Sequence, residues 1–139
     1  MGESGLKPDI EVAVTTDPFE VETLYARFAG REGLATGTTV MHHGRVKVPG
    51  KVVPDFSRVT LDALVDDVVE ALRNIAVDAT WKFHLQRIFI LHRLGTVGPG
   101  DDVLLVICSS VTRREAFAAC AWLVDEIKQE KFIALKEWP

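Results

Sequence analysis

Three cationic side chains in the C-terminal part of this 139-residue sequence are candidates to bind an anionic ligand, and their spacing limits how they could do so. Arg113 lies in the first turn of a predicted helix, where free backbone N–H groups and the helix dipole favour an anion. Lys128 follows fifteen residues later, and Lys136 eight residues after that. At about 1.5 Å of rise per residue, an unbroken helix would separate Arg113 from Lys128 by roughly 22 Å. One small ligand therefore cannot contact both side chains of a single chain.

Two interpretations satisfy this separation, and both require a partner. Either the site is composite, with the helix start of one subunit beside the helix end of another, or the ligand is long, such as an inserted peptide tail. A third interpretation is that Arg113, Lys128 and Lys136 are solvated surface charges, as most lysines and arginines are. Composition leaves all three open.

Further basic and imidazole side chains lie on a predicted strand over residues 38–48, TTVMHHGRVKV. The period of two in a strand places Arg45 and Lys47 together on one face. His42 and His43 point to opposite faces, and the usual carboxylate or cysteine companions are missing, which disfavours a metal site. A Pro-Gly turn follows, after which residues 51–53 are expected to return as a hairpin partner.

The C-terminal helix that positions the cations begins with a capping box, formed by Thr112 and Glu115. We expect the stretch from residue 109 to the end of the sequence to be one long helix. An apolar stripe at helical spacing faces the core. Its members are Ala116, Phe117, Cys120, Leu123, Val124 and Ile127.

The remaining elements follow from turn signals and apolar periodicity. Asp17 is expected to cap a first helix, with Pro18 at its first position, Glu20 closing the box and Gly30 as its end. The stripe of a second helix comprises Leu61, Leu64, Val65, Val68, Val69, Leu72 and Ile75. Residues 10–14 predict an edge strand, and residues 87–92 and 103–109 predict two buried antiparallel strands joined by the turn GTVGPGDD. The fold class is α+β, with three helices against a largely antiparallel sheet.

The bulk composition bounds the possibilities. The length predicts a single domain over residues 1–139, of which about residues 1–8 are loosely held. A net charge of −4 argues against non-specific binding to nucleic acid or to an anionic membrane. Without an apolar run of about 18 residues or a signal-peptide core, the expected location is the cytoplasm. Cys108 and Cys120 are expected to be buried thiols rather than a disulfide or a metal pair.

The stretch from His92 to Trp138 resembles the MoaE family, the catalytic large subunit of molybdopterin synthase. The shared features are an H-R-x-G turn, a G-D before an apolar strand, an S-x-H-R-x-x-A-F helix start, a D-x-x-K and a terminal W-K-x-E. This sequence supplies His92, Arg93 and Gly95; Gly100 and Asp101; Ser110, Arg113, Ala116 and Phe117; Asp125 and Lys128; and Lys136 and Glu137. In the N-terminal half, DPFEVETLYARFA and TTVMHHGRVK are similar to the family's first helix and a strand.

The resemblance implies a MoaE-like α/β-hammerhead fold, no cofactor and a sulfur-transfer reaction. Each protomer of a homodimer, within a heterotetramer, would receive the C-terminal Gly-Gly tail of a small ubiquitin-like, MoaD-like carrier. The thiocarboxylate on that tail would convert cyclic pyranopterin monophosphate into the dithiolene of molybdopterin. The resemblance makes Lys128 and Lys136 the catalytic pair. The substrate-binding positions it implies are Arg45, Val46, Lys47, Thr112, Arg113, Glu137 and Trp138.

The sequence also departs from the family pattern. Thr112 replaces a histidine, and a threonine caps a helix but cannot shuttle a proton near neutral pH. Lys47 replaces an arginine and loses its bidentate fork. His42 replaces a phenylalanine, and Leu135 a tryptophan. The leading hypothesis is a divergent, active molybdopterin synthase subunit. The alternative is a paralogue that binds a ubiquitin-like tail or a pterin without performing the chemistry.

Overall fold

The computed structural model describes residues 9–139, so the loosely held segment expected over residues 1–8 lies outside the described residues. The elements in chain order are β1 (Asp9–Thr15), α1 (Val21–Ala29), β2 (Thr38–Arg45), β3 (Arg58–Ala63), α2 (Val68–Phe83), β4 (Arg87–Arg93), β5 (Gly95–Val97), β6 (Asp102–Ser110), α3 (Arg113–Lys128) and β7 (Ile133–Trp138). Three helices with antiparallel and mixed sheets confirm the predicted α+β class. None of the helices in this part of the chain is long and apolar enough to cross a membrane.

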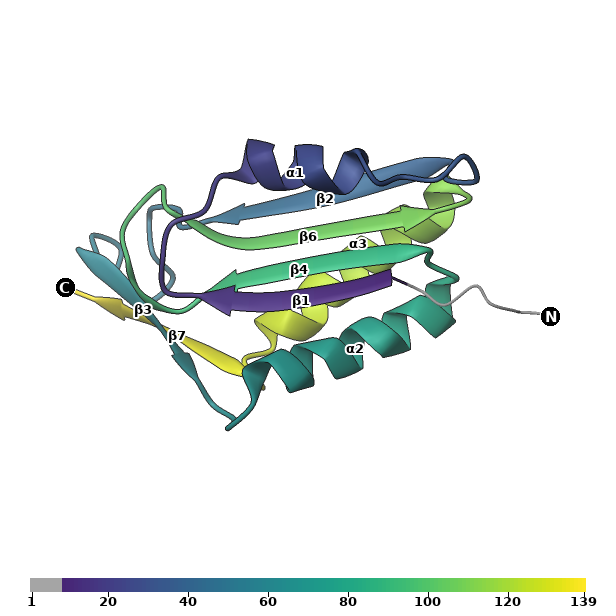
Figure 1. The fold of residues 1–139 in the computed structure, drawn as a ribbon. Coiled ribbons are helices and arrows are strands. Elements are labelled where there is room, and N and C mark those ends of the chain that lie inside the picture. The colour runs from purple at the N-terminus through teal and green to yellow at the C-terminus, as the bar shows by residue number, and fades with distance from the viewer. Residues whose placement is uncertain (1–8) are drawn as a thin grey trace.

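The strands form two sheets. The larger has the order β1-β4-β6-β2, and the smaller, β5-β3-β7, lies at one end of it (Figure 1). β1 pairs with β4 in parallel at the edge of the larger sheet, whereas β6 pairs antiparallel with both β4 and β2. The predicted edge strand and the predicted antiparallel pair are therefore confirmed. Helix α1 covers one face of the larger sheet, and α2 and α3 cover the other.

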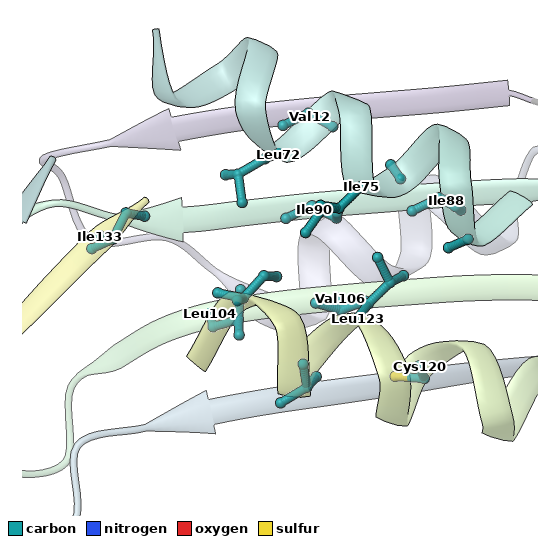
Figure 2. Packing of buried hydrophobic residues seen from close by; sticks show 14 of the residues in the cluster. Val12, Leu72, Ile75, Ile88, Ile90, Leu104, Val106, Cys120, Leu123 and Ile133 are labelled. Carbon is teal, nitrogen blue, oxygen red and sulfur yellow. The ribbon is translucent and has the colours of Figure 1, made fainter. Parts of the chain in front are cut away.

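Alternation along β6 explains why helices cover both faces. Leu104 and Val106 pack into the larger core with α2 and α3, as Figure 2 shows beside Leu72 and Leu123. The intervening Leu105 packs into a second core under α1. Side chains buried on both faces make the strand a continuous apolar run, which is why the sequence predicted it so directly.

The two cysteines lie between β6 and α3. Cys108 is fully buried and Cys120 is nearly so, and both thiols are free, as predicted. The neighbouring Cys120 and burial raise the pKa of the Cys108 thiol far above its usual value. Cys108 therefore remains a protonated, apolar side chain of the core.

The start of α1 differs from the prediction. The helix begins at Val21, Glu20 is its N-cap without a side-chain bond, and the predicted cap at Asp17 is wrong. The Asp17 N–H instead donates to Thr15 Oγ1 at 3.0 Å, so this residue belongs to a turn after β1. The predicted end at Gly30 is confirmed.

The second predicted helix begins too early. Helix α2 starts at Val68, capped by Asp67, whose carboxylate accepts from the Glu70 N–H at 2.9 Å. Leu61 instead lies on β3, where it and Val59 are buried on alternate positions. An apolar residue every second position fits a strand as well as a helix over so short a stretch.

The C-terminal stretch is not one helix. Helix α3 ends at Lys128, Glu130 adopts a left-handed φ of 55°, and β7 then pairs antiparallel with β3. Phe117, predicted to belong to the core stripe, is 59% exposed. The turn GTVGPGDD contains the short strand β5, and residues 51–53 form a loop instead of the predicted hairpin strand.

Candidate active site

A pocket of about 260 Å³ lies where the end of the larger sheet meets the smaller one. Residues from β2, β3, β4, β6, β7, the end of α3 and the loop after β2 contribute to its wall. They are His42, Gly44, Arg45, Val46, Lys47, Pro49, Lys51, Phe56, Val59, Leu61, His92, Val103, Leu104, Ile127, Lys128, Glu130, Ile133, Leu135 and Glu137. The wall therefore combines an apolar floor with four cationic and two carboxylate side chains.

The end of β2 and the residues directly after it form the basic side of the pocket. Strict alternation predicted that Val46 would face away from Arg45 and Lys47, but all three residues line the pocket. The register between β2 and β6 shifts by one residue between Gly44 and Arg45, and the residue left without a partner is Val103 of β6. Because β2 ends at Arg45, strand alternation does not extend to Val46 and Lys47.

Arg45 is oriented by the loop before β6. Its guanidinium donates to the Gly100 carbonyl, from Nη2 at 3.1 Å and from Nε at 3.3 Å. The Asp102 carboxylate lies 3.9 Å from Nε, so the charge of Arg45 is only partly compensated. The side chain remains 59% exposed and can still bind an anion.

Lys128 is the last residue of α3, and its side chain lines the pocket. His42 lines the same pocket, and its Nε2 is buried without a hydrogen-bond partner. Burial and then the nearby charge of Lys128 lower the pKa of His42. The imidazole is therefore neutral at pH 7 beside a cationic ammonium.

The two neighbouring histidines lie in different surroundings, as predicted. His43 Nε2 lies 2.6 Å from Asp102 Oδ1 across the β2–β6 pair. Over residues 9–139, no group of three or more His, Cys, Asp and Glu side chains is arranged to hold a metal ion.

Glu137 lines the pocket, but its carboxylate is already bound. It accepts hydrogen bonds from the backbone N–H groups of Lys51 at 2.9 Å, Val52 at 2.8 Å and Val53 at 2.7 Å. These donors, the N–H of Val53 first, lower the pKa of Glu137. The carboxylate thus stays ionised, as the partner of a loop.

Lys136 and Trp138 lie outside the pocket wall. On β7 the side chains of Leu135 and Glu137 line the pocket, and the alternation of a strand turns the residues between and after them away. Lys136 Nζ lies 4.0 Å from the centroid of the Trp138 ring, and the Trp138 Nε1–H donates to Thr60 Oγ1 at 2.9 Å. Within one protomer, the structure does not bring Lys136 to Lys128.

Thr112 and Arg113 lie at the opposite end of α3 from the pocket. Thr112 is the predicted cap, and its hydroxyl accepts from the Glu115 N–H at 3.4 Å. Arg113 is exposed and does not line the pocket of its own chain. The separation predicted from the length of the helix is therefore present.

Four polar residues of the wall were not predicted as site residues: His42, Lys51, His92 and Glu130. His92 is buried, its Nδ1 lies 2.7 Å from the Arg93 carbonyl, and burial lowers its pKa. Its position at the end of a buried strand was a signal in the sequence. Lys51 and Glu130 enter through a loop and after a helix end, for which the sequence offered no signal.

Known proteins with the same pattern identify the family. The family model described as MoaE protein matches residues 14–130. A molybdopterin synthase catalytic subunit from Pyrococcus abyssi is 31% identical over 125 residues, which is 88% of this chain and 80% of the relative. Another from Caulobacter vibrioides is 34% identical over 118 residues, which is 84% and 75% of the two chains.

Solved structures share the fold. Molybdopterin synthase from Staphylococcus aureus superposes with a TM-score of 0.76 at 24% identity, covering 91% of this chain and 90% of that one. A complex of subunits 1 and 2 of molybdopterin-converting factor from Helicobacter pylori gives a TM-score of 0.69 at 13% identity, covering 92% and 83%. With the match of the family model over most of its length, the chain belongs to the MoaE family.

Proposed function

We propose that this chain is the catalytic subunit of a molybdopterin synthase and that its reaction takes place in the pocket lined by Lys128. The observation that carries this assignment is that Lys128 shares one pocket with Arg45 and Lys47, although they are distant in the sequence. Two cations at the end of β2 suit a cyclic phosphate, and the apolar floor suits a pterin ring.

The proposed substrates are cyclic pyranopterin monophosphate and a thiocarboxylate on the C-terminal tail of a small carrier. In each transfer a C–S bond forms at a pterin side-chain carbon as a C–O bond at that carbon breaks, and its oxygen leaves as water or as the opened phosphate ester. Water then cleaves the acyl–sulfur bond to the carrier, which leaves a carboxylate on the carrier tail. Arg45 and Lys47 hold the phosphate, and the Lys128 ammonium stabilises the developing carboxylate and can exchange a proton with the reacting atoms.

The carrier is proposed to dock at the mouth of the pocket. Val48, Val52 and Leu135 lie in or beside the pocket wall and are 58%, 83% and 47% exposed. Such an apolar rim suits a protein partner better than water. The structure of the Helicobacter pylori subunit complex, which has the same fold, is consistent with a carrier of this kind.

A second copy of this chain is proposed to complete the site. Arg113 lies at the far end of α3, so only the Arg113 of a neighbouring protomer could reach the Lys128 pocket. Phe117, one turn further along α3, is 59% exposed, and β2 is an edge strand of its sheet. Both features suit a two-fold contact with the same surface of another copy.

Reconstitution with a thiocarboxylated carrier and the cyclic pterin tests the assignment. Lys128→Ala is expected to abolish dithiolene formation and to leave the oligomeric state unchanged. Lys131→Ala is the matched control, because Lys131 pairs with Glu126 at 3.4 Å outside the pocket wall and should retain activity. Full turnover in Lys128→Ala would refute the proposed site.

One observation favours a binding module as the second candidate. Lys136, implied by the resemblance to be catalytic, stacks on Trp138 instead of facing the pocket. If the unmodified protein binds the carrier but produces no dithiolene under conditions in which a known synthase is active, this second function is supported.

A further inference from the structure

We propose that Glu137 is a positioning residue, which holds residues 51–53 as one wall of the pocket, and that it does not contact the substrate. The inference deepens the proposed function, and it rests on that function only for its effect on turnover. The C-terminal strand β7 would thus set the shape of the cationic side of the site.

The geometry at the Glu137 carboxylate carries the proposal. Oε1 accepts from the Val52 and Val53 N–H groups at 2.8 and 2.7 Å, and Oε2 accepts from the Lys51 N–H at 2.9 Å. Three successive N–H groups thus converge on one side chain, as they do on an anion bound in a backbone nest. Both oxygens are engaged, which leaves the carboxylate poorly placed to bind a substrate donor as well.

Gly50 provides a second, independent observation. A Cβ built on Gly50 would lie 2.5 Å from Glu137 Oε1 and would also collide with the Val53 carbonyl oxygen. The loop therefore wraps around the carboxylate so closely that only glycine fits at this position. The backbone of residues 50–53 thus surrounds the Glu137 carboxylate closely, as expected if this side chain fixes the loop to β7. The three hydrogen bonds that link Glu137 to residues 51–53 are called the tie below.

The tie has a consequence for the cations. Pro49 and Lys51 lie in or next to the segment that surrounds the Glu137 carboxylate, and both line the pocket. Lys47, two residues before Pro49, lines it as well. Within residues 9–139, Glu137 provides the side-chain hydrogen bonds to the backbone of residues 51–53, and the other bond of this stretch, from the Phe56 N–H to the Val53 carbonyl, stays inside the loop. Without the carboxylate, the loop would sample more conformations, and its lysines would bind an anion less well.

The same arrangement explains how an acidic residue is tolerated in a pocket that is proposed to take a phosphate. A free carboxylate there would repel the substrate. Three N–H dipoles compensate most of the charge of Glu137, with a smaller contribution from the charge of Lys51, so Lys47 and Lys128 remain available to the ligand.

Two variants break the tie from opposite sides: Glu137→Gln, which keeps the size of the side chain, and Gly50→Ala, which pushes the loop away. Amide hydrogen exchange at residues 51–53 is expected to accelerate about tenfold or more in both. The KM for the cyclic pterin is expected to rise about tenfold with kcat within about twofold, because the reacting groups are untouched. Glu137→Gln keeps the test available if Gly50→Ala fails to fold.

Glu130→Gln is the control for charge. Glu130 also lines the pocket, and its Oε1 accepts from the Leu135 N–H at 2.9 Å, away from the loop. It should leave amide exchange at residues 51–53 unchanged. If Glu130→Gln raises the KM as much as Glu137→Gln does, the effect is one of charge and the proposal is overturned.

Amide exchange separates the tie from the proposed function. Unchanged exchange at residues 51–53 in Glu137→Gln would overturn the tie, whatever the activity. Faster exchange with an unchanged KM would overturn its role at the site. An unmodified protein that makes no dithiolene would contradict the proposed function, while the exchange data would still report on the tie.

Discussion

Lys128 and Lys136 are close in sequence, but their ammonium groups have different surroundings. Lys128 lines the pocket with Arg45, whereas Lys136 lies over the Trp138 ring. A contact between an ammonium and an exposed aromatic ring is worth about 0.5–1 kcal/mol, which a bound anion can readily replace. Substrate binding could therefore recruit Lys136 only by drawing it away from Trp138.

The two histidines of the pocket make the stability of the protein depend on pH. Burial lowers the pKa of His42 and of His92 from 6.5, so the folded state binds fewer protons than the unfolded state just below that pH. Their contribution is complete above pH 6.5 and is lost as the pH falls toward their lowered values. The free energy of unfolding, measured in urea between pH 7.5 and about 5, should fall, and less steeply in His92→Gln. Equal slopes in the two proteins would contradict a role for His92.

Some site residues could be predicted and others could not. Lys128, Arg45 and Lys47 were named through the motifs of the family, and the structure places them in one pocket. The family motif named Glu137 as a substrate-binding residue, but sequence position could not show that its carboxylate accepts from the N–H groups of residues 51–53. Lys51 was missed because its loop is held in position by hydrogen bonds to Glu137 on β7, which is 84–86 residues away in the sequence.

At the scale of elements, the capping of α3 is open to a direct test. Thr112→Ala removes the acceptor of the Glu115 N–H and should lower the free energy of unfolding by about 0.5–1 kcal/mol. Thr112→Ser, which keeps the hydroxyl, should lie close to the unmodified protein. Chemical denaturation of the three proteins measures both effects, and equal losses in the two variants would show that the hydroxyl is not what stabilises the helix start.

The errors in the predicted elements have a common physical origin. The helix pattern was extended through Leu61 and past Lys128 because local apolar spacing was compatible with it. The structure uses these stretches as β3 and β7, whose paired residues are 70 to 80 positions apart in the sequence. Pairing at such a distance leaves no local signal in the sequence. Strands β4 and β6 are buried on both faces, and they could be predicted because each is a continuous apolar run.

At the scale of the whole molecule, the proposed composite site predicts complementation between two inactive variants. A dimer of Lys128→Ala with Arg113→Ala contains one site with both defects and one site with neither. An equal, freely exchanging mixture should therefore recover about a quarter of the unmodified activity, since half of the dimers are mixed and each has one intact site. Dithiolene formation before and after subunit exchange measures this.

Two results would contradict that arrangement. Recovery would be absent if Arg113 acted within its own chain, because every site would then carry a defect. Arg113→Ala alone would retain full activity if its guanidinium were only a solvated charge. Arg114→Ala is the matched control, since Arg114 is also exposed and lies on the same helix turn.

The burial of the two thiols between β6 and α3 has a practical consequence. Cys108 is inaccessible to solvent and Cys120 is 5% exposed, and both are free. An alkylating reagent can reach Cys108 only when the helix separates from the sheet, so the alkylation rate reports the frequency of that opening without any introduced label. The native chain thus contains its own probe for asking whether carrier or pterin tightens the scaffold around the reaction.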